Sequence, residues 1–229
     1  MFQIIPIDSS IFHLKFKKKA DMFLGLMRCQ EFYECRDKNI RGKKFSLEKL
    51  IEAYCKMNDE GSFTYFDDWS AFNIPDYSIR NFLELNGDNL LEHEKVVFDK
   101  IGSLVEIKSN IAPTAKSYLI ATYTHKNEDS QLDLDHEIAH GLFYTSTMYN
   151  KIVTDMVNRM DKKVLNRLFN SLRKMNYCDE VLHDEVQAYL STGAESMINC
   201  RKDIARPFAK FFKQYIGSIK AKIKRKARI

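Results

Sequence analysis

Segment 132–145, LDLDHEIAHGLFYT, contains two histidines and a glutamate in the order His136, Glu137 and His140. Residues four apart on a helix lie on one face, so both imidazoles can reach the same metal ion. Glu137 follows the first histidine, and its carboxylate can accept a proton from a water molecule held at that ion. The spacing therefore predicts a Zn²⁺ site with His136 and His140 as ligands and Glu137 as general base.

The alternative interpretation is a polar helix surface on which both histidines are solvated. Against it stand apolar residues at helical spacing, Leu134, Ile138 and Leu142, with Ala139 and Phe143 beside them. An apolar stripe of this kind is typical of a helix that packs against the rest of the protein. The pattern favours a partly buried helix, and with it the metal site.

The stretch HEIAHGLFY resembles the active-site helix of the zincin superfamily of zinc metallopeptidases. Just upstream, segment 117–124 is rich in β-branched and aromatic residues and predicts a strand. In that superfamily an edge strand before the active-site helix pairs with an extended peptide substrate. The resemblance therefore implies a zinc-dependent metallopeptidase in which Tyr118, Ile120 and Thr122 bind substrate through the main chain. It extends from this strand to Leu190 and does not include the first 110 residues.

The class of zincin depends on the third ligand. Metzincins carry H-E-x-x-H-x-x-G-x-x-H, but Phe143 and Ser146 stand at the positions of their glycine and third histidine. Gluzincins take a glutamate from a downstream helix, in a pattern E-x-x-A-D to which Glu185-Val-Gln-Ala-Tyr189 is similar. The resemblance thus implies Glu185 as third ligand. Tyr189 departs from the pattern, which has an aspartate there that hydrogen-bonds to a ligand histidine.

Other residues in the same region are alternatives for these roles. The alternative interpretation of Glu185 is a surface carboxylate on an amphipathic helix. The rival third ligands are His183, Asp184, Glu180 and Glu195. Asp184 is also the nearest candidate to support a ligand histidine in the absence of an aspartate at position 189.

Two further side chains have possible roles in catalysis. Tyr144 lies one helical turn beyond His140 and can donate a hydrogen bond to a carbonyl oxyanion, although such a tyrosine often only packs at a cleft wall. His125, at the end of the predicted strand, can stabilise a transition state in the same way. A solvated histidine in a turn is the simpler interpretation of His125.

The order of the predicted elements indicates an α+β fold with a small N-terminal and central sheet and a mostly helical C-terminal half. Strands are predicted at 2–7 and 116–126, and segment 61–79 is predicted to be a folded loop. Predicted helices cover 16–35, 45–57, 90–104, 134–145, 148–160, 162–175, 180–190 and the region from about 204. We expect one zincin-like domain over 1–229. It consists of a mixed helical and aromatic segment (1–110), a metal-site core (116–191) and a basic helix (201–229).

The aromatic residues and the cysteines favour structural roles. Trp69 is the only tryptophan and is surrounded in sequence by Phe63, Tyr65, Phe66 and Phe72. This cluster can line a substrate pocket, but packing in a core is the favoured interpretation. The five cysteines include no C-x-x-C pair, which excludes a zinc ribbon and argues against a disulfide framework. We interpret them as buried thiols.

The charge is distributed unevenly along the chain. Residues 201–229 contain 11 lysines and arginines and one acidic residue, whereas the remaining 200 residues contain 25 basic and 30 acidic groups. The basic helix is compatible with an anionic membrane or nucleic acid as partner, but a docked helix with a solvated end is favoured. The absence of a signal peptide, of apolar runs near 18 residues and of paired cysteines predicts a cytoplasmic protein.

Three classes of function follow from these features. The leading one is a zinc-dependent metallopeptidase that acts on a peptide or protein substrate. Peptide deformylases share H-E-x-x-H but take a cysteine ligand from an upstream E-G-C motif, which this sequence lacks. The second is a catalytically silent zincin-like binding or regulatory module, against which the retained Glu137 argues. The third is a binder of anionic partners that uses the basic helix and a structural metal.

Overall fold

The computed structural model describes residues 2–58, 61–111, 116–124, 130–175 and 177–226 of the 229-residue chain. The chain forms two compact units. The N-terminal unit contains Met1–Ile5 and Phe12–Lys126, and the C-terminal unit contains Pro6–Ile11 and Asn127–Ile229. Their assembly into the single expected domain stays a prediction, whereas the α+β class is confirmed.

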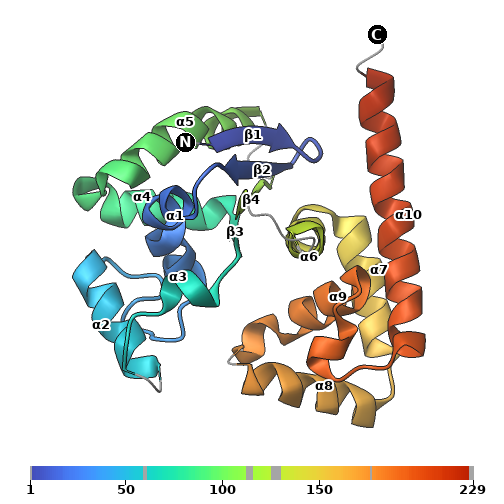
Figure 1. The fold of residues 1–229 in the computed structure, drawn as a ribbon. Coiled ribbons are helices and arrows are strands. Elements are labelled where there is room, and N and C mark those ends of the chain that lie inside the picture. The colour runs from blue at the N-terminus through green and yellow to red at the C-terminus, as the bar shows by residue number, and fades with distance from the viewer. Residues whose placement is uncertain (1, 59–60, 112–115, 125–129, 176, 227–229) are drawn as a thin grey trace. The chain divides into compact units, whose positions relative to one another are not determined.

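The elements of the N-terminal unit combine a sheet with helices (Figure 1). They are β1 (Phe2–Pro6), β2 (Ile11–Phe16), α1 (Lys19–Glu34), α2 (Leu47–Met57), α3 (Tyr65–Asp68), β3 (Ala71–Pro75), α4 (Asp76–Asn86), η1 (Gly87–Asn89), α5 (Glu92–Ile111) and β4 (Tyr118–Tyr123). From residue 130 on, the elements described in the C-terminal unit are helices. Its elements are α6 (Ser130–Thr145), α7 (Thr147–Asn158), α8 (Lys162–Lys174), η2 (Asp179–Val181), α9 (Leu182–Thr192), η3 (Glu195–Ile198) and α10 (Lys202–Lys226).

The described residues form a four-stranded sheet with the strand order β1-β2-β4-β3. β3 pairs antiparallel with β4, with Asn73 opposite Ile120. On the other side of β4, the backbone N–H of Thr124 donates to the carbonyl of Phe16. β4 is therefore an interior strand, and its residues 118–122 are all buried.

Helix α1 forms the centre of the N-terminal core. It packs against β3 and β4 and against α4 and α5 (Figure 1). Burial of apolar and aromatic side chains is the main stabilising contribution to such a core. The aromatic cluster at 63–72 belongs to it, because Tyr65 and Phe72 are buried against Phe23. The expectation that this cluster packs in a core is confirmed for Tyr65 and Phe72, whereas Trp69 is 37% exposed.

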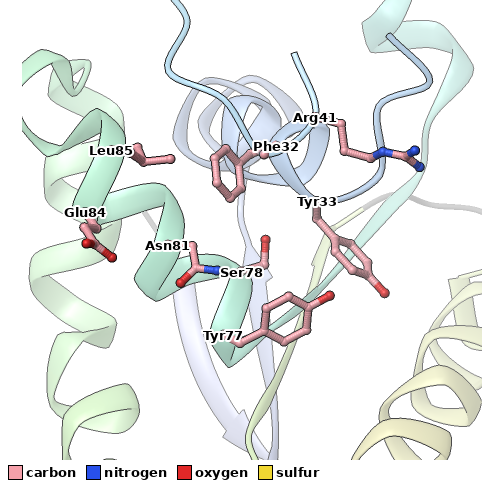
Figure 2. A pocket seen from close by; sticks show the side chains of 9 residues that line it. Phe32, Tyr33, Arg41, Tyr77, Ser78, Asn81, Glu84 and Leu85 are labelled. Atoms are coloured by element: carbon pink, nitrogen blue, oxygen red, sulfur yellow. The ribbon is translucent and has the colours of Figure 1, made fainter. Parts of the chain in front are cut away.

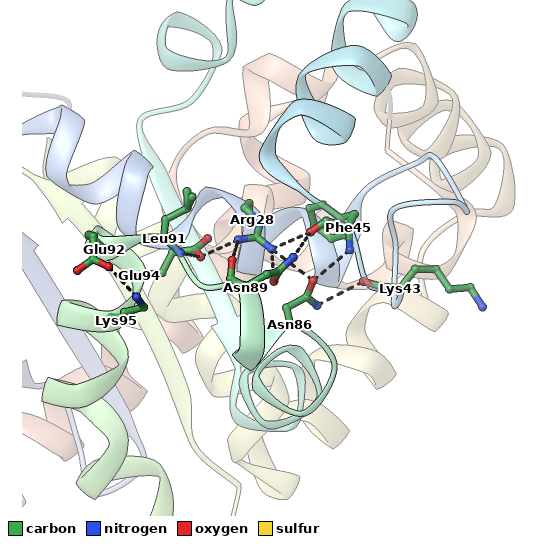
Figure 3. Close-up of polar contacts among 9 residues, drawn as sticks. All are labelled: Arg28, Lys43, Phe45, Asn86, Asn89, Leu91, Glu92, Glu94 and Lys95. Carbon is green, nitrogen blue, oxygen red and sulfur yellow. Dashed lines mark hydrogen bonds and ion pairs between the residues drawn. The ribbon is translucent and has the colours of Figure 1, made fainter.

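A buried arginine crosslinks the helices of this unit (Figure 3). Arg28 of α1 donates to Glu94 Oε2 at 2.8 Å and to the carbonyl of Phe45 at 2.7 Å. Its guanidinium also lies 5.5 Å from the ring centroids of both Phe45 and Phe82. Arg28 and Glu94 are each 1% exposed, so the pair is shielded from water. A buried ion pair of this kind costs most when one partner is removed.

The structure confirms some of the predicted helices and strands and contradicts other predictions. Ser46 caps α2 as expected, since its Oγ accepts a hydrogen bond from the N–H of Lys49. The loop predicted at 61–79 is wrong, because it contains α3, β3 and the start of α4. Strand β2 lies in a stretch for which the sequence predicts no strand. β2 and β3 are mostly buried on both faces and lack the alternating pattern that identifies a half-exposed strand.

The basic C-terminal segment forms a docked helix. Helix α10 packs against α9 and buries Ala205, Phe208 and Phe212. Residues 227–229 lie outside the described part of the chain. The five cysteines carry free thiols, of which Cys29, Cys35 and Cys200 are buried and Cys55 and Cys178 are half-buried. Among the described residues, no helix combines the length and apolar character that a membrane crossing requires.

Candidate metal centre

Helices α6 and α9 carry the candidate ligands and pack against each other in the C-terminal unit (Figure 1). On α6, Ile138, Ala139 and Leu142 are buried and place the opposite, polar residues of the helix beside α9. On α9, the acidic residues Asp184 and Glu185 lie in the first turn. The positive end of the helix dipole stabilises negative charge at this position. Two amphipathic helices thus bring histidines and carboxylates together.

His136, His140 and Glu185 form one compact group. Each offers a ligand atom, and these atoms lie within 4.8 Å of one another. The Nε2 atoms of the two histidines are 3.1 Å apart. Glu185 approaches with Oε2 at 3.6 Å from His136 Nε2 and Oε1 at 3.5 Å from His140 Nε2. Both sequence-predicted histidines and the implied third ligand therefore converge on one point.

The three side chains lie close enough together to hold one metal ion. Ligand atoms about 2.0–2.1 Å from a tetrahedral zinc ion lie roughly 3.3 Å from one another. The 3.1 Å between the two Nε2 atoms is close to this value. The separations of 3.5 and 3.6 Å from these atoms to Glu185 are made by its two different carboxylate oxygens. In addition, Glu185 Oε2 is buried and has no hydrogen-bond partner among the described residues. A cation between the three side chains satisfies this carboxylate oxygen, so the residues fit a metal ion.

Asp184 supports His140 from the side opposite the ligand atom. Its Oδ1 lies 2.9 Å from His140 Nδ1 and also accepts a hydrogen bond of 2.9 Å from Gln187 Nε2. Gln187 in turn accepts at Oε1 from the hydroxyl of the buried Tyr149. A carboxylate at Nδ1 fixes the imidazole tautomer that presents Nε2 to a metal. The structure thus gives Asp184 the supporting position that the sequence left open.

The charges of His140 and Glu185 shift each other's pKa. Burial opposes protonation of His140, but the carboxylates of Asp184 and Glu185 outweigh it and hold the His140 pKa well above its usual value. Burial likewise opposes ionisation of Glu185, but the two histidines lower its pKa below the usual value. In the metal-free protein these groups therefore form an ion pair, and a bound cation has to displace a proton from His140.

Glu137 lies in the same environment as the ligands. It is buried on α6 beside His136. Burial is the main influence on the pKa of Tyr189, which it raises to about 12, and the negative charge of Glu137 contributes to this increase. The same charge also raises the pKa of His140. The negative charge of Glu137 therefore acts on a candidate ligand of α6 and on a side chain of α9.

The other sequence candidates lie in different environments. His183 packs against the ring of Phe169, with 5.0 Å between the ring centroids, and is not part of the metal-binding group. Glu180 is exposed in η2, and Glu195 is buried in η3. Tyr144 is half-buried on α6, and its role as a hydrogen-bond donor stays a prediction. His125 lies outside the described residues.

The expectation of an edge strand for peptide binding is wrong. β4 lies between β2 and β3, so its main-chain groups pair with strands on both sides. Tyr118, Ile120 and Thr122 are buried. The Tyr118 hydroxyl donates to Asn73 at 2.6 Å, and Thr122 Oγ1 lies 2.7 Å from His13 Nε2. A substrate strand cannot add to β4 without displacing one of its neighbours.

The N-terminal unit contains a pocket (Figure 2). Its walls come from α1, α4 and the segment after α1, and its aromatic side includes Tyr33 and Tyr77, whose ring centroids are 6.2 Å apart. The full lining is Phe32, Tyr33, Arg41, Gly42, Tyr77, Ser78, Asn81, Glu84 and Leu85. None of these residues is a histidine or cysteine, so the pocket offers no comparable set of metal ligands.

Comparison of the chain with protein-family models, with curated proteins and with solved structures finds no match.

Replacement of Asp184 by alanine is expected to weaken zinc binding. Loss of a group that orients a ligand histidine typically lowers metal affinity by about 10–100-fold. Titration against a chromophoric chelator measures this change directly. The control is Asp179→Ala, which removes an exposed carboxylate paired with Arg173 outside the metal-binding group. Equal zinc affinities in the two variants would show that Asp184 does not support the site.

Proposed function

We propose that this protein is a zinc-dependent metallopeptidase, with His136, His140 and Glu185 as the zinc ligands. The observation that carries the proposal is the convergence of these three side chains at separations between 3.1 and 3.6 Å. Two histidines and one glutamate are the ligand set of catalytic zinc sites that keep a fourth position open for water. Structural zinc sites instead close all four positions with protein ligands, usually including cysteine.

The residues of the site have separate tasks in this proposal. Zinc, when bound, supplies a Lewis acid that lowers the pKa of water and polarises a peptide carbonyl. Glu137 accepts the proton of the attacking water and delivers it to the amine that leaves. Asp184 holds His140 in the tautomer with Nε2 facing the metal. Tyr144, on α6 four residues after His140, donates a hydrogen bond to the oxyanion.

The buried position of Glu137 supports a hydrolytic role over a purely structural one. Burial of a carboxylate in a water-poor environment costs free energy, so a neutral side chain would be more stable at a position without a chemical task. Glu137 is not needed to complete the His-His-Glu group. A general base adjacent to a metal-held water accounts for its position. A silent zincin-like module has no such requirement.

Metal analysis combined with peptide hydrolysis tests the proposal. Purified protein is expected to contain about one zinc ion per chain and to cleave members of an unbiased peptide library. Chelation should abolish cleavage, and zinc should restore it. The double variant His136→Ala/His140→Ala should contain no zinc and remain inactive after zinc is added.

Each outcome of this experiment has a distinct meaning. A zinc-free wild-type protein that also fails to bind added zinc contradicts the metal site. A stoichiometric zinc protein that cleaves no peptide contradicts the peptidase activity and favours the silent module. Cleavage that persists in the double variant would assign the activity to a contaminant or to another site.

A further inference from the structure

The side chain of Gln187 uses both ends of its amide inside the C-terminal unit. Gln187 lies on α9, three residues after Asp184, and is fully buried. Its Nε2 donates to Asp184 Oδ1 at 2.9 Å, and its Oε1 accepts from the Tyr149 hydroxyl at 3.1 Å. Asp184 contacts His140 Nδ1 through the same Oδ1 atom, also at 2.9 Å. A continuous chain of polar contacts therefore runs from α7 through α9 to a candidate metal ligand on α6.

The chemistry of the side chains fixes the direction of this chain. An ionised carboxylate only accepts hydrogen bonds, so the end of the amide that faces Asp184 has to be the donor Nε2. The amide oxygen then faces Tyr149, whose hydroxyl donates to it. An ionised glutamate at position 187 would have no proton to donate to Asp184, and an apolar residue would bond to neither neighbour. An amide at this position therefore suits both of its neighbours.

Tyr149 is held at its backbone and at its ring. Its backbone N–H donates at 3.2 Å to Oγ of Ser146, the residue that caps α7. Its ring stacks on Phe211 of α10, with 5.5 Å between the centroids and an interplanar angle of 24°. Tyr149 and Gln187 are both fully buried, so bulk water does not compete for the hydrogen bond between them. The hydroxyl at the outer end of the chain therefore has a defined position.

We propose that Gln187 is a positioning residue that orients the Asp184 carboxylate toward His140, with Tyr149 as its anchor. The side chain of Asp184 is 23% exposed, so a carboxylate without a second partner could rotate toward solvent. The hydrogen bond from Gln187 holds Oδ1 beside His140 Nδ1, which keeps Nε2 of the imidazole directed at the metal position. This inference rests on the proposed metal site but not on peptide hydrolysis.

The variant Gln187→Met removes both hydrogen-bonding ends of the amide and keeps a side chain of similar length. We expect zinc affinity to fall by about 3–10-fold, less than for Asp184→Ala, because Gln187 acts on the ligand only through Asp184. Tyr149→Phe removes only the hydroxyl and keeps the ring against Phe211, so its effect should be smaller but in the same direction. Competition with a chromophoric chelator measures the affinities.

Two variants serve as matched controls. Gln131→Met removes an amide-to-carboxylate bond of 2.7 Å to Asp135 on α6, which involves none of the three candidate ligands. Tyr215→Phe removes a hydroxyl that bonds to Ser146 at 2.7 Å, and its ring contacts that of Tyr149. Both controls should bind zinc with wild-type affinity. Circular dichroism of the metal-free proteins establishes that each variant is folded.

A double-mutant cycle separates positioning from a general structural role. If Gln187 acts through Asp184, Gln187→Met should change zinc affinity by less than about twofold in a protein that already carries Asp184→Ala. A substitution that only loosens the packing of α9 would lower the affinity by the same factor in both backgrounds. The visible absorption of the cobalt-substituted proteins reports on the arrangement of the ligand atoms. We expect it to change for Gln187→Met and to stay as in the wild type for Gln131→Met.

The outcomes separate this inference from the metal site itself. A wild-type protein that binds no zinc overturns both. If the wild type binds zinc, a folded Gln187→Met variant of equal affinity overturns only the positioning role. A loss that is equally large in the Asp184→Ala background, or in the Gln131→Met control, overturns it as well. If Gln187→Met does not fold, the cycle is carried out with Tyr149→Phe, for which an unchanged zinc affinity would overturn the inference.

Discussion

Replacement of Glu137 by glutamine is expected to lower kcat for peptide hydrolysis by about 10²–10⁴-fold, the usual contribution of a general base. Glutamine has nearly the same shape as glutamate but cannot take up the proton of the attacking water. Because Glu137 is not one of the three candidate ligands, the variant should still bind zinc at the wild-type stoichiometry. Loss of activity with retention of metal is the combination that assigns the base.

The matched control is Glu195→Gln. Glu195 is also a buried carboxylate of the C-terminal unit, but it lies in η3 and is not part of the metal-binding group. This variant should keep both zinc and activity. Steady-state kinetics and metal analysis of the two variants are compared under the same conditions. A Glu137→Gln enzyme with wild-type kcat would exclude Glu137 as the general base.

Replacement of Arg28 by methionine is expected to destabilise the N-terminal unit by about 3–5 kcal/mol, the range for breaking a buried ion pair. The variant leaves Glu94 buried without its positive partner, and burial already raises the pKa of this carboxyl group above its usual value. It also removes hydrogen bonds to the carbonyl of Phe45 and to Asn89 Oδ1. Helices α1 and α5 then lose their shared polar contact.

Urea denaturation followed by Trp69 fluorescence measures this effect. Trp69 is the only tryptophan and packs beside Tyr65 in the same unit, so its signal reports on this region of the protein. The control Lys95→Ala breaks the exposed Lys95–Glu92 pair seen in Figure 3 and should not shift the midpoint measurably. Similar midpoints for Arg28→Met and Lys95→Ala would contradict the prediction.

A double variant separates the loss of the ion pair from the loss of packing. Arg28→Met/Glu94→Leu removes both charges, so no carboxylate remains buried without a partner. Replacement of a whole buried pair by apolar residues is often nearly neutral. The double variant should therefore be more stable than Arg28→Met alone, although it contains one more substitution. If it is less stable, the carboxylate of Glu94 is not the source of the destabilisation.

The two candidate histidines could be predicted from the sequence because their convergence depends on local geometry. His136 and His140 are separated by about one helical turn, and any helix over this segment brings them to one face. The prediction of Glu185 rests on the similarity of residues 185–189 to the E-x-x-A-D pattern. In the structure its side chain lies with the two histidines in one group. The contact of Asp184 with His140 depends on the packing of α6 against α9. The hydrophobic periodicity of the sequence does not reveal which helices pack together.

The features that escaped prediction depend on contacts distant in sequence. The place of β4 inside the sheet depends on its pairing with β2, for which residues 109 positions apart have to meet. Nothing in the composition of Tyr118–Tyr123 distinguishes an interior strand from an edge strand buried on both faces.

The interior position of β4 also has a consequence for synthesis on the ribosome. β2 leaves the ribosome early, but its partner strand follows only after a separation of 109 positions. At about 5–20 residues per second, this delay lasts roughly 5–20 s. During that time the edge of β2 exposes unpaired backbone groups, to which strands of other chains can bind. The nascent N-terminal segment should therefore depend on chaperones more than the helical C-terminal unit does.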